Sequence, residues 1–130
     1  PLIRYAIGDL AAPARCPCGQ IDLPAITQLL GKQRGLLMHP NGHWVFSTEL
    51  SPKIRDTPGI RQYQVVQHSP SHFTLRAIAQ DGVDITVLQD NIRSHFIQVF
   101  GESLQIDFDW CHEIPRLPGG KYMEFIGLHQ

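Results

Sequence analysis

The sequence lacks the features that mark several large classes of protein. Its apolar runs are far shorter than the roughly 20 residues of a membrane-spanning helix, so we expect no membrane span. The 11 Lys and Arg residues are balanced by 12 Asp and Glu residues and form no basic stripe that would bind a nucleic acid. Only three cysteines occur, and this odd number argues against a disulfide framework. With no signal peptide before Pro1, these absences predict a cytoplasmic protein.

The composition is that of an ordinary globular domain. The 130 residues are 42% hydrophobic and 18% charged, which suffices for one domain with a modest core. The chain starts at Pro1 rather than Met, and its first residues read like the middle of a protein, so we expect a C-terminal piece of a longer chain. A short strand is expected at residues 2–5, followed by irregular chain to residue 24. Residues 26–30 are compatible with a helical turn or a twisted strand.

Two hairpins are predicted between residues 36 and 79. Residues 36–38 and 43–46 are short apolar runs around Pro40-Asn41-Gly42, and Asn-Gly between such runs is a strong hairpin signal. Strand-like alternation then occurs at residues 61–67 and 72–79, with a turn at residues 69–71. Between the hairpins, Ser47 or Thr48 can cap a short helix that ends at Pro58-Gly59.

A long helix and a further strand complete the pattern. Apolar residues three or four positions apart predict a helix over residues 83–100 whose buried face comprises Ile85, Leu88, Ile92, Phe96 and Val99. Residues 104–110 then alternate with the period of a half-buried strand. The expected fold class is α+β: a small antiparallel sheet with helices packed on one face, preceded by a short hairpin.

Lys121 is the leading catalytic candidate, because it follows the Pro118-Gly119-Gly120 turn. A lysine on such a turn can reach a phosphate or carboxylate bound elsewhere. The alternative is a simple solvated turn.

The cysteines, the histidines and the aspartates of residues 104–110 are better explained by structural roles than by catalysis or metal binding. A zinc site would need Cys16, Cys18, Cys111 and His112 to converge, and the C-x-C spacing is shorter than usual for zinc. The seven histidines show no ligand pair on one element, and His95 is expected to cap or pack. Asp107 and Asp109 are either paired carboxylates or, more simply, the solvated side of a strand.

Several segments, in order, carry a family resemblance. Arg4-Tyr5-Ala6-Ile7-Gly8-Asp9 looks like a Y-R-T-G-D segment, and Cys16-Pro17-Cys18-Gly19 with Leu23-Pro24-Ala25-Ile26 looks like C-x-C-G-R-x-L-P-x-I. Residues 31–37 are similar to G-R-x-D-D-M-L, residues 42–46 to R-G-x-x-V-F-P, and residues 114–121 to L-P-R-x-x-G-K. The chain thus resembles the end of an adenylate-forming ligase of the phenylacetate-CoA ligase, CapK-like and coenzyme F390 synthetase group.

This resemblance implies a domain organisation and a reaction. Residues 1–30 would end the large N-terminal domain and form the junction, and residues 31–130 would form the C-terminal lid domain. The enzyme would use ATP and Mg²⁺ to convert a carboxylic acid, with aryl acids common in the group, into an acyl adenylate. A thiol, either CoA or the pantetheine of an acyl carrier protein, would then displace AMP. Most ATP contacts belong to the large domain, so the piece alone is expected to be inactive.

The resemblance also implies residue roles. Lys121 would contact the carboxylate and the α-phosphate, whereas Asp9, with Tyr5, would bind the ribose. Lys32, Arg34 and Gly35 would form the hinge on which the lid turns between half-reactions, and Gly42 would lie at the thiol tunnel. Two positions depart from the group: Arg34 or Gly35 replaces its hinge aspartate, and Ser47 replaces the proline after V-F.

A non-catalytic function is the alternative hypothesis. The α+β pattern also suits a non-catalytic module, ACT-like or ferredoxin-like, that binds a small ligand or a partner through its sheet, and an oligomer is compatible with either reading.

Overall fold

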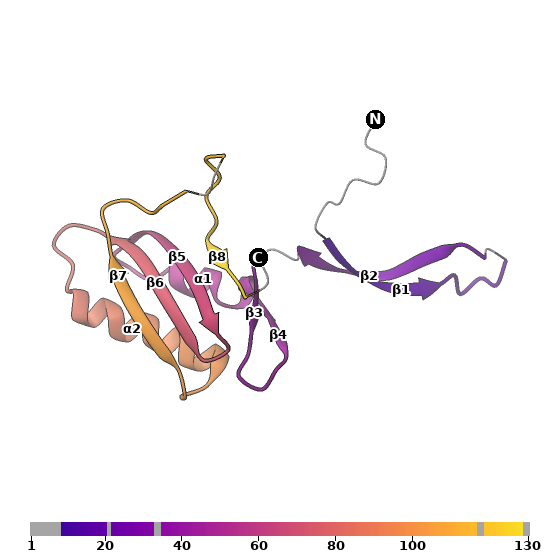
Figure 1. Ribbon diagram of the computed structural model, residues 1–130, viewed down its shortest axis with the longest axis horizontal. Helices are drawn as coiled ribbons and strands as arrows, with labels where there is room; N and C mark the ends of the chain where they lie inside the picture. Colours follow the sequence, from indigo (N-terminus) through magenta and orange to yellow (C-terminus); the bar gives the residue numbers. More distant parts are fainter. Residues whose placement is uncertain (1–8, 21, 33–34, 117–118, 129–130) are drawn as a thin grey trace. The chain divides into compact units, whose positions relative to one another are not determined.

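The computed structural model describes residues 9–20, 22–32, 35–116 and 119–128. The chain divides into two compact units, residues 1–34 and residues 35–130 (Figure 1). The strand expected at residues 2–5 lies outside the described residues. Within the described part, no helix has the length and apolar character needed to cross a membrane.

The first unit contains a two-stranded antiparallel sheet. β1 (Asp9–Arg15) pairs with β2 (Pro24–Lys32), with irregular register between Leu10 and Ala11 and between Ala12 and Pro13. The expectation of irregular chain up to residue 24 was therefore wrong. A two-stranded ribbon has little core to cover, and Ile26 on β2 is 59% exposed; the alternating pattern that marks a half-buried strand is accordingly weak.

The second unit opens with the predicted Asn-Gly hairpin. β3 (Leu36–Met38) pairs antiparallel with β4 (Trp44–Phe46), and the turn is closed by hydrogen bonds between His39 and the Gly42 and His43 backbone. A 3₁₀ turn (Ser47–Glu49) and the short helix α1 (Ser51–Arg55) follow. The prediction that Ser47 or Thr48 caps this helix was wrong. The 3₁₀ turn occupies both positions, and α1 starts after Leu50 with Pro52 in its first turn.

The main sheet has four strands in the order β7-β6-β5-β8. β5 (Ile60–Ser69) and β6 (His72–Ala79) form the second predicted hairpin, while β7 (Gln105–Trp110) pairs with β6 and β8 (Phe125–Ile126) pairs with β5.

The α+β class is confirmed, but the sheet is mixed rather than purely antiparallel. Only β5 and β6 run antiparallel; β7 is parallel to β6, and β8 is parallel to β5. The helix α2 (Ile85–Phe100) lies between β6 and β7 in the chain. Such a crossover returns the chain to the end at which the previous strand began, so the next strand runs parallel.

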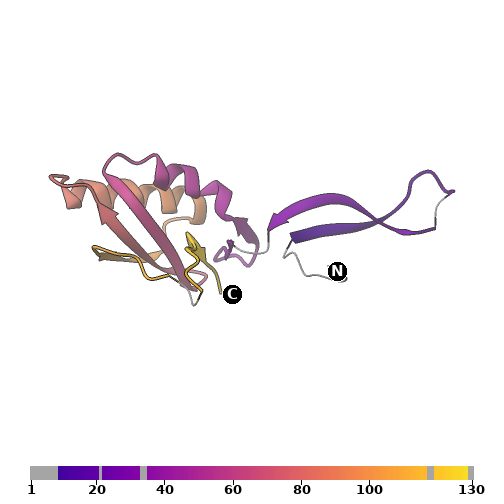
Figure 2. The ribbon, with the colours of Figure 1, turned by 90° about the horizontal axis from the view of Figure 1, so that it is seen from above.

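The two helices lie on the same face of this sheet (Figure 2). The core between helices and sheet includes Ile54 of α1, Tyr63, Val65, Phe73, Leu75 and Ala77 of the hairpin, and Leu88, Ile92, Phe96 and Phe100 of α2. Asp84 caps α2 by accepting hydrogen bonds from the Thr86 and Val87 amides at 2.9 and 3.3 Å, which fixes where the helix begins.

Candidate functional site

Lys121 lies in the segment that joins β7 to β8. Its side chain is exposed, and it follows Gly119 and Gly120, whose φ angles of 96° and 76° belong to the left-handed region that glycine tolerates best. Arg116 holds the turn by donating a hydrogen bond from Nη1 to the Gly120 carbonyl at 3.1 Å.

The chain immediately after Lys121 is fixed to β5. The Tyr122 hydroxyl donates to the Tyr63 carbonyl, and Gln64 Nε2 donates to the Met123 carbonyl at 2.9 Å. The Val65 amide donates to the Glu124 carbonyl at 2.7 Å. Lys121 therefore presents an exposed cationic side chain from a backbone that is held in place, which suits contact with an oxyanion brought from outside.

A small pocket of about 120 Å³ adjoins this segment, and its lining includes Tyr122 and Glu124 together with Arg55, Arg61 and Tyr63. Burial raises the pKa of Tyr63 to about 12. Burial, followed by the Glu124 carboxylate, also raises the pKa of Tyr122. Both phenols consequently stay protonated at neutral pH and act as hydrogen-bond donors.

The β3–β4 hairpin carries Gly42, whose φ is 90°. Apart from Gly42 and its two chain neighbours, no heavy atom of the described residues would lie within 4 Å of a Cβ added there. The His39 and His43 rings stack at its base, with centroids 4.3 Å apart. The buried Gln67 joins the hairpin to β5, accepting from the Met38 amide at 2.8 Å and donating to the Met38 carbonyl at 2.6 Å.

Sequence reasoning missed the two buried glutamines, Gln64 and Gln67. For Gln67 a signal existed, since it occupies an inward position in the Tyr63, Val65, Gln67 alternation of β5. A polar residue at an inward position requires a partner.

The predicted hinge and nucleotide residues are distributed over both units. Asp9 begins β1 and is exposed, and Lys32 ends β2. Gly35 begins the second unit with a φ of 85°, and a Cβ there would lie 2.7 Å from Ser47 Oγ. Tyr5 and Arg34 lie outside the described residues. The roles expected for all these residues stay predictions.

The four residues of the possible zinc site divide between the two units, so their convergence stays a prediction. Cys16 and Cys18 contact each other through their sulfur atoms. Cys111 instead directs its thiol to the Ala77 carbonyl, and burial is the main cause that raises its pKa, which disfavours the thiolate that zinc needs. Over the described ranges, no three His, Cys, Asp or Glu side chains gather as a metal site would require.

Asp107 and Asp109 lie on the exposed side of β7, and each contacts a neighbouring cationic or titratable group. Asp107 Oδ2 is 2.6 Å from His72 Nε2, and Asp109 Oδ2 is 3.3 Å from Arg76 Nε. Both side chains are about half exposed. The solvated reading of this strand face therefore fits the structure better than a pair of catalytic carboxylates.

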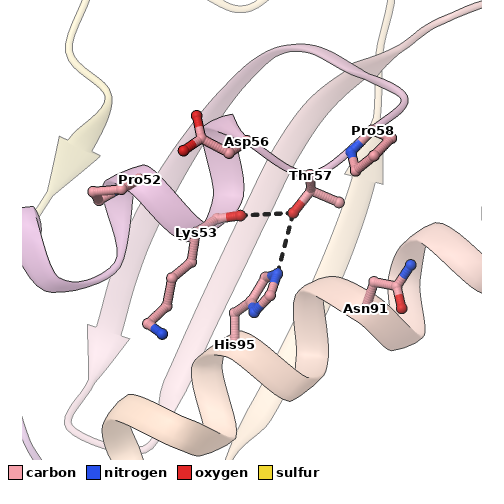
Figure 3. Close-up of a pocket in the computed structure, with 7 residues that line it drawn as sticks. All are labelled: Pro52, Lys53, Asp56, Thr57, Pro58, Asn91 and His95. Atoms are coloured by element: carbon pink, nitrogen blue, oxygen red, sulfur yellow. Dashed lines mark hydrogen bonds between the residues drawn. The ribbon is translucent and has the colours of Figure 1, made fainter.

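A larger pocket, of about 450 Å³, lies between α1 and α2 (Figure 3). At its wall, Thr57 Oγ1 donates to the Lys53 carbonyl at 2.7 Å and lies 3.2 Å from His95 Nε2. Because the single hydroxyl proton of Thr57 is already used, His95 must donate from Nε2. Its Nδ1 then carries a lone pair, which is buried and has no partner in the described part of the chain.

We expect His95 to make the stability of the chain pH-dependent. Burial, followed by the nearby Lys53 charge, lowers its folded-state pKa. The unfolded chain, with a His pKa of about 6.5, therefore binds the proton more readily, and the free energy of unfolding should fall as the pH drops below that value. Urea unfolding between pH 5 and pH 8 would measure this. A His95→Gln variant should lose part of the fall, and an unchanged slope would contradict the prediction.

Comparison with known proteins identifies the family. The CapK C-terminal domain family matches residues 37–126, which is most of the chain and includes Gly42 and Lys121. None of the curated proteins searched gave a match.

Several solved structures that share the fold are described as ligases. A 2-hydroxyisobutyryl-CoA ligase in its postadenylation state aligns with a TM-score of 0.55 at 18% identity over 94% of this chain and 28% of its own. Its open conformation, with 2-HIB-AMP and CoA, gives 0.54 at 16% identity over 92% and 27%. A structure from studies of the fatty acyl-adenylate ligases of E. coli and L. pneumophila gives a TM-score of 0.53 at 18% identity over 88% of this chain and 20% of its own. The chain thus spans about a quarter of the length of these proteins.

The matched range contains the Asn-Gly hairpin, both helices, the four-stranded sheet and the Lys121 segment, in the order that the sequence resemblance implied. Because the family match covers well over half of its residues, the chain belongs to the CapK C-terminal domain family.

Proposed function

We propose that this chain is the C-terminal lid domain of an ATP-dependent ligase that activates a carboxylic acid as an acyl adenylate. The family match and the likeness to adenylate-forming ligases support this reading. The observation that carries it is the exposed Lys121 on a segment anchored to the sheet. The proposal extends to the expected division into residues 1–30, as the end of the large domain and its junction, and residues 31–130, as the lid.

In the proposed reaction, a carboxylate attacks the α-phosphate of ATP, pyrophosphate leaves, and an acyl adenylate forms. Negative charge accumulates on the α-phosphate oxygens, and the Lys121 ammonium would lower the barrier by lying beside them. ATP with Mg²⁺ supplies the leaving group and is held mainly by the large domain. A thiol then displaces AMP and loses its proton.

The remaining roles follow the two-step reaction. The exposed Asp9 carboxylate can accept hydrogen bonds from the ribose hydroxyls, and Tyr5, four positions earlier in the sequence, would contribute to the same site. Lys32, Arg34 and Gly35 would serve as the hinge, and the Gly42 turn, beside which there is open space, would reach the thiol of CoA or of a carrier protein. A rotating lid accounts for both half-reactions with one small domain.

The first test is acid-dependent exchange of pyrophosphate into ATP by the full-length protein that carries this chain. A panel of aryl, hydroxylated and fatty acids is supplied one at a time, and CoA is added afterwards to detect thioester. We expect exchange with one class of acid and thioester formation with CoA or with an added carrier protein. Failure of the full-length protein to bind ATP in calorimetry would overturn the proposal.

A further inference from the structure

Three consecutive residues after Lys121 have partners outside their own segment. Tyr122 and Met123 are bound to Tyr63 and to Gln64 of β5, respectively. Glu124 is bound twice, through its carbonyl to the Val65 amide at 2.7 Å and through Oε2 to Ser51 Oγ at 3.3 Å. Contacts with β5 and α1 thus determine the position of the Lys121 backbone. In each of the side-chain contacts, the two residues are 59 or more positions apart in the sequence.

Gln64 makes the most demanding of these contacts. It is only 2% exposed, although it lies on the face of the sheet opposite the helices. Its Nε2 donates to the Met123 carbonyl at 2.9 Å, and its Oε1 accepts from Arg76 Nη1 at 3.2 Å. Because the amide is buried, water cannot readily replace a partner that is lost.

The contacts of Gln64 form part of a chain of polar groups across the sheet. Arg76 also pairs through Nε with Asp109 Oδ2 at 3.3 Å. The chain of contacts runs from the Met123 carbonyl through Gln64 on β5 and Arg76 on β6 to Asp109 on β7. It thereby links the Lys121 segment to three strands, whereas β8 itself pairs with β5 through only Phe125 and Ile126.

Tyr122 supplies a second and independent anchor. It is the residue next to Lys121, and its hydroxyl donates to a main-chain carbonyl, that of Tyr63, rather than to a mobile side chain. Replacing Tyr122 by phenylalanine removes this hydrogen bond and leaves neither a buried charge nor a large cavity, because the ring is retained.

We propose that Tyr122 and Gln64 are positioning residues that hold the Lys121 backbone in the geometry needed for adenylation. The inference rests on the proposed function and adds to it. Neither side chain touches the reacting groups; each acts through Lys121. An exposed lysine on an untethered Gly-Gly turn would sample many positions, and misplacing a catalytic group by about 1 Å can cost about 100-fold in rate.

Two substitutions separate the anchors from the rest of the structure. Tyr122→Phe removes one hydroxyl. Gln64→Glu keeps an acceptor for Arg76 but removes the donor that holds the Met123 carbonyl. In the full-length protein, each should lower kcat for acid-dependent pyrophosphate exchange by about 10- to 100-fold, with little change in KM for ATP. Thioester formation from supplied acyl adenylate should keep its wild-type rate.

Thr74→Val is the matched control. It removes a hydrogen bond of similar length, 2.8 Å to His68, from the same face of the sheet without touching the Lys121 segment, and it should leave both half-reactions unchanged. In a Lys121→Ala background, Tyr122→Phe and Gln64→Glu should cause no further loss of exchange, because they act through the missing lysine.

The outcomes distinguish this inference from the function on which it rests. Normal exchange in both anchor variants, alongside impaired exchange in Lys121→Ala, overturns the inference alone. Equal losses in both half-reactions, or losses that persist in the Lys121→Ala background, show a purely structural role and also overturn it. Normal exchange in Lys121→Ala overturns the catalytic role proposed for that lysine.

Discussion

Lys121→Ala is expected to slow acid-dependent pyrophosphate exchange by the full-length protein by about 100- to 1,000-fold, the usual cost of removing one donor that stabilises a developing oxyanion. The substitution removes the ammonium group of Lys121 and leaves the contacts of residues 122–124 in place. Thioester formation from supplied acyl adenylate should be nearly unchanged, because the charge that Lys121 stabilises develops only during adenylation. Rapid-quench measurement of each half-reaction would separate the two.

Lys53→Ala is the control for this prediction. Lys53 is an exposed lysine on α1, and its Nζ donates a hydrogen bond to Gln98 Oε1 at 3.2 Å. Its removal changes the net charge by the same amount, so it accounts for any general electrostatic attraction of ATP. Equal losses in Lys53→Ala and Lys121→Ala would show that the effect is not specific to the Lys121 position.

Phe73→Ala is expected to have the largest effect on folding. Phe73, the second residue of β6, is completely buried, and its ring centroid lies 5.4 Å from that of Phe96 and 4.9 Å from that of Phe100. Truncating such a residue costs about 3–5 kcal/mol, and domains of this size have a total stability of about 5–15 kcal/mol. Urea unfolding of the chain should show the midpoint shifted far toward zero denaturant.

Val87→Ala is the control for the core prediction. Val87 lies on α2 but is 56% exposed, so shortening it removes little buried surface, and its effect should stay within about 0.5 kcal/mol. A loss for Val87→Ala as large as that for Phe73→Ala would show that α2, rather than the core beneath it, limits stability.

Local signals predicted the parts of the fold whose patterns are complete within a few residues. Asn41-Gly42 identified the first hairpin, and the apolar spacing identified α2, although Ile85 is 36% exposed and Phe100, which the pattern omitted, is buried. The two-residue strand β8 was missed because two residues show no period. Strand direction was also beyond the pattern, since alternation is the same in parallel and antiparallel strands.

The candidate site shows the same division. Lys121 was predicted as a catalytic candidate from the residues that precede it, because a Pro-Gly-Gly-Lys turn is a local pattern, and its role stays a prediction. Tyr122 and Gln64, which hold the backbone beside Lys121, were not predicted. Their partners lie 59 positions away in the sequence, and no local pattern indicates so distant a contact. A readable signal existed only for Gln67, a glutamine at an inward position of β5, which binds the Met38 backbone of the first hairpin rather than the chain beside Lys121.

Ser47, where the group has a proline, contacts Gly35, which with Arg34 is one of the two residues that can stand in place of the group's aspartate. The Ser47 amide donates to the Gly35 carbonyl at 2.9 Å, which a proline at position 47 could not do. The missing Cβ of Gly35 leaves room for the Ser47 side chain. Gly35 and Ser47 are therefore compatible with each other: Gly35 leaves space for the Ser47 side chain, and Ser47 has the amide that binds the Gly35 carbonyl.

The parallel pairing of β8 with β5 has a consequence for the order of folding. The β5–β6 hairpin closes a short loop, whereas β8 pairs with β5 across about 60 residues of intervening chain. Closing the longer loop costs more chain entropy. The lysine-bearing segment is therefore expected to join the sheet late, after the folding barrier has been crossed. Changes within it should then mainly accelerate unfolding and leave the folding rate almost unaltered.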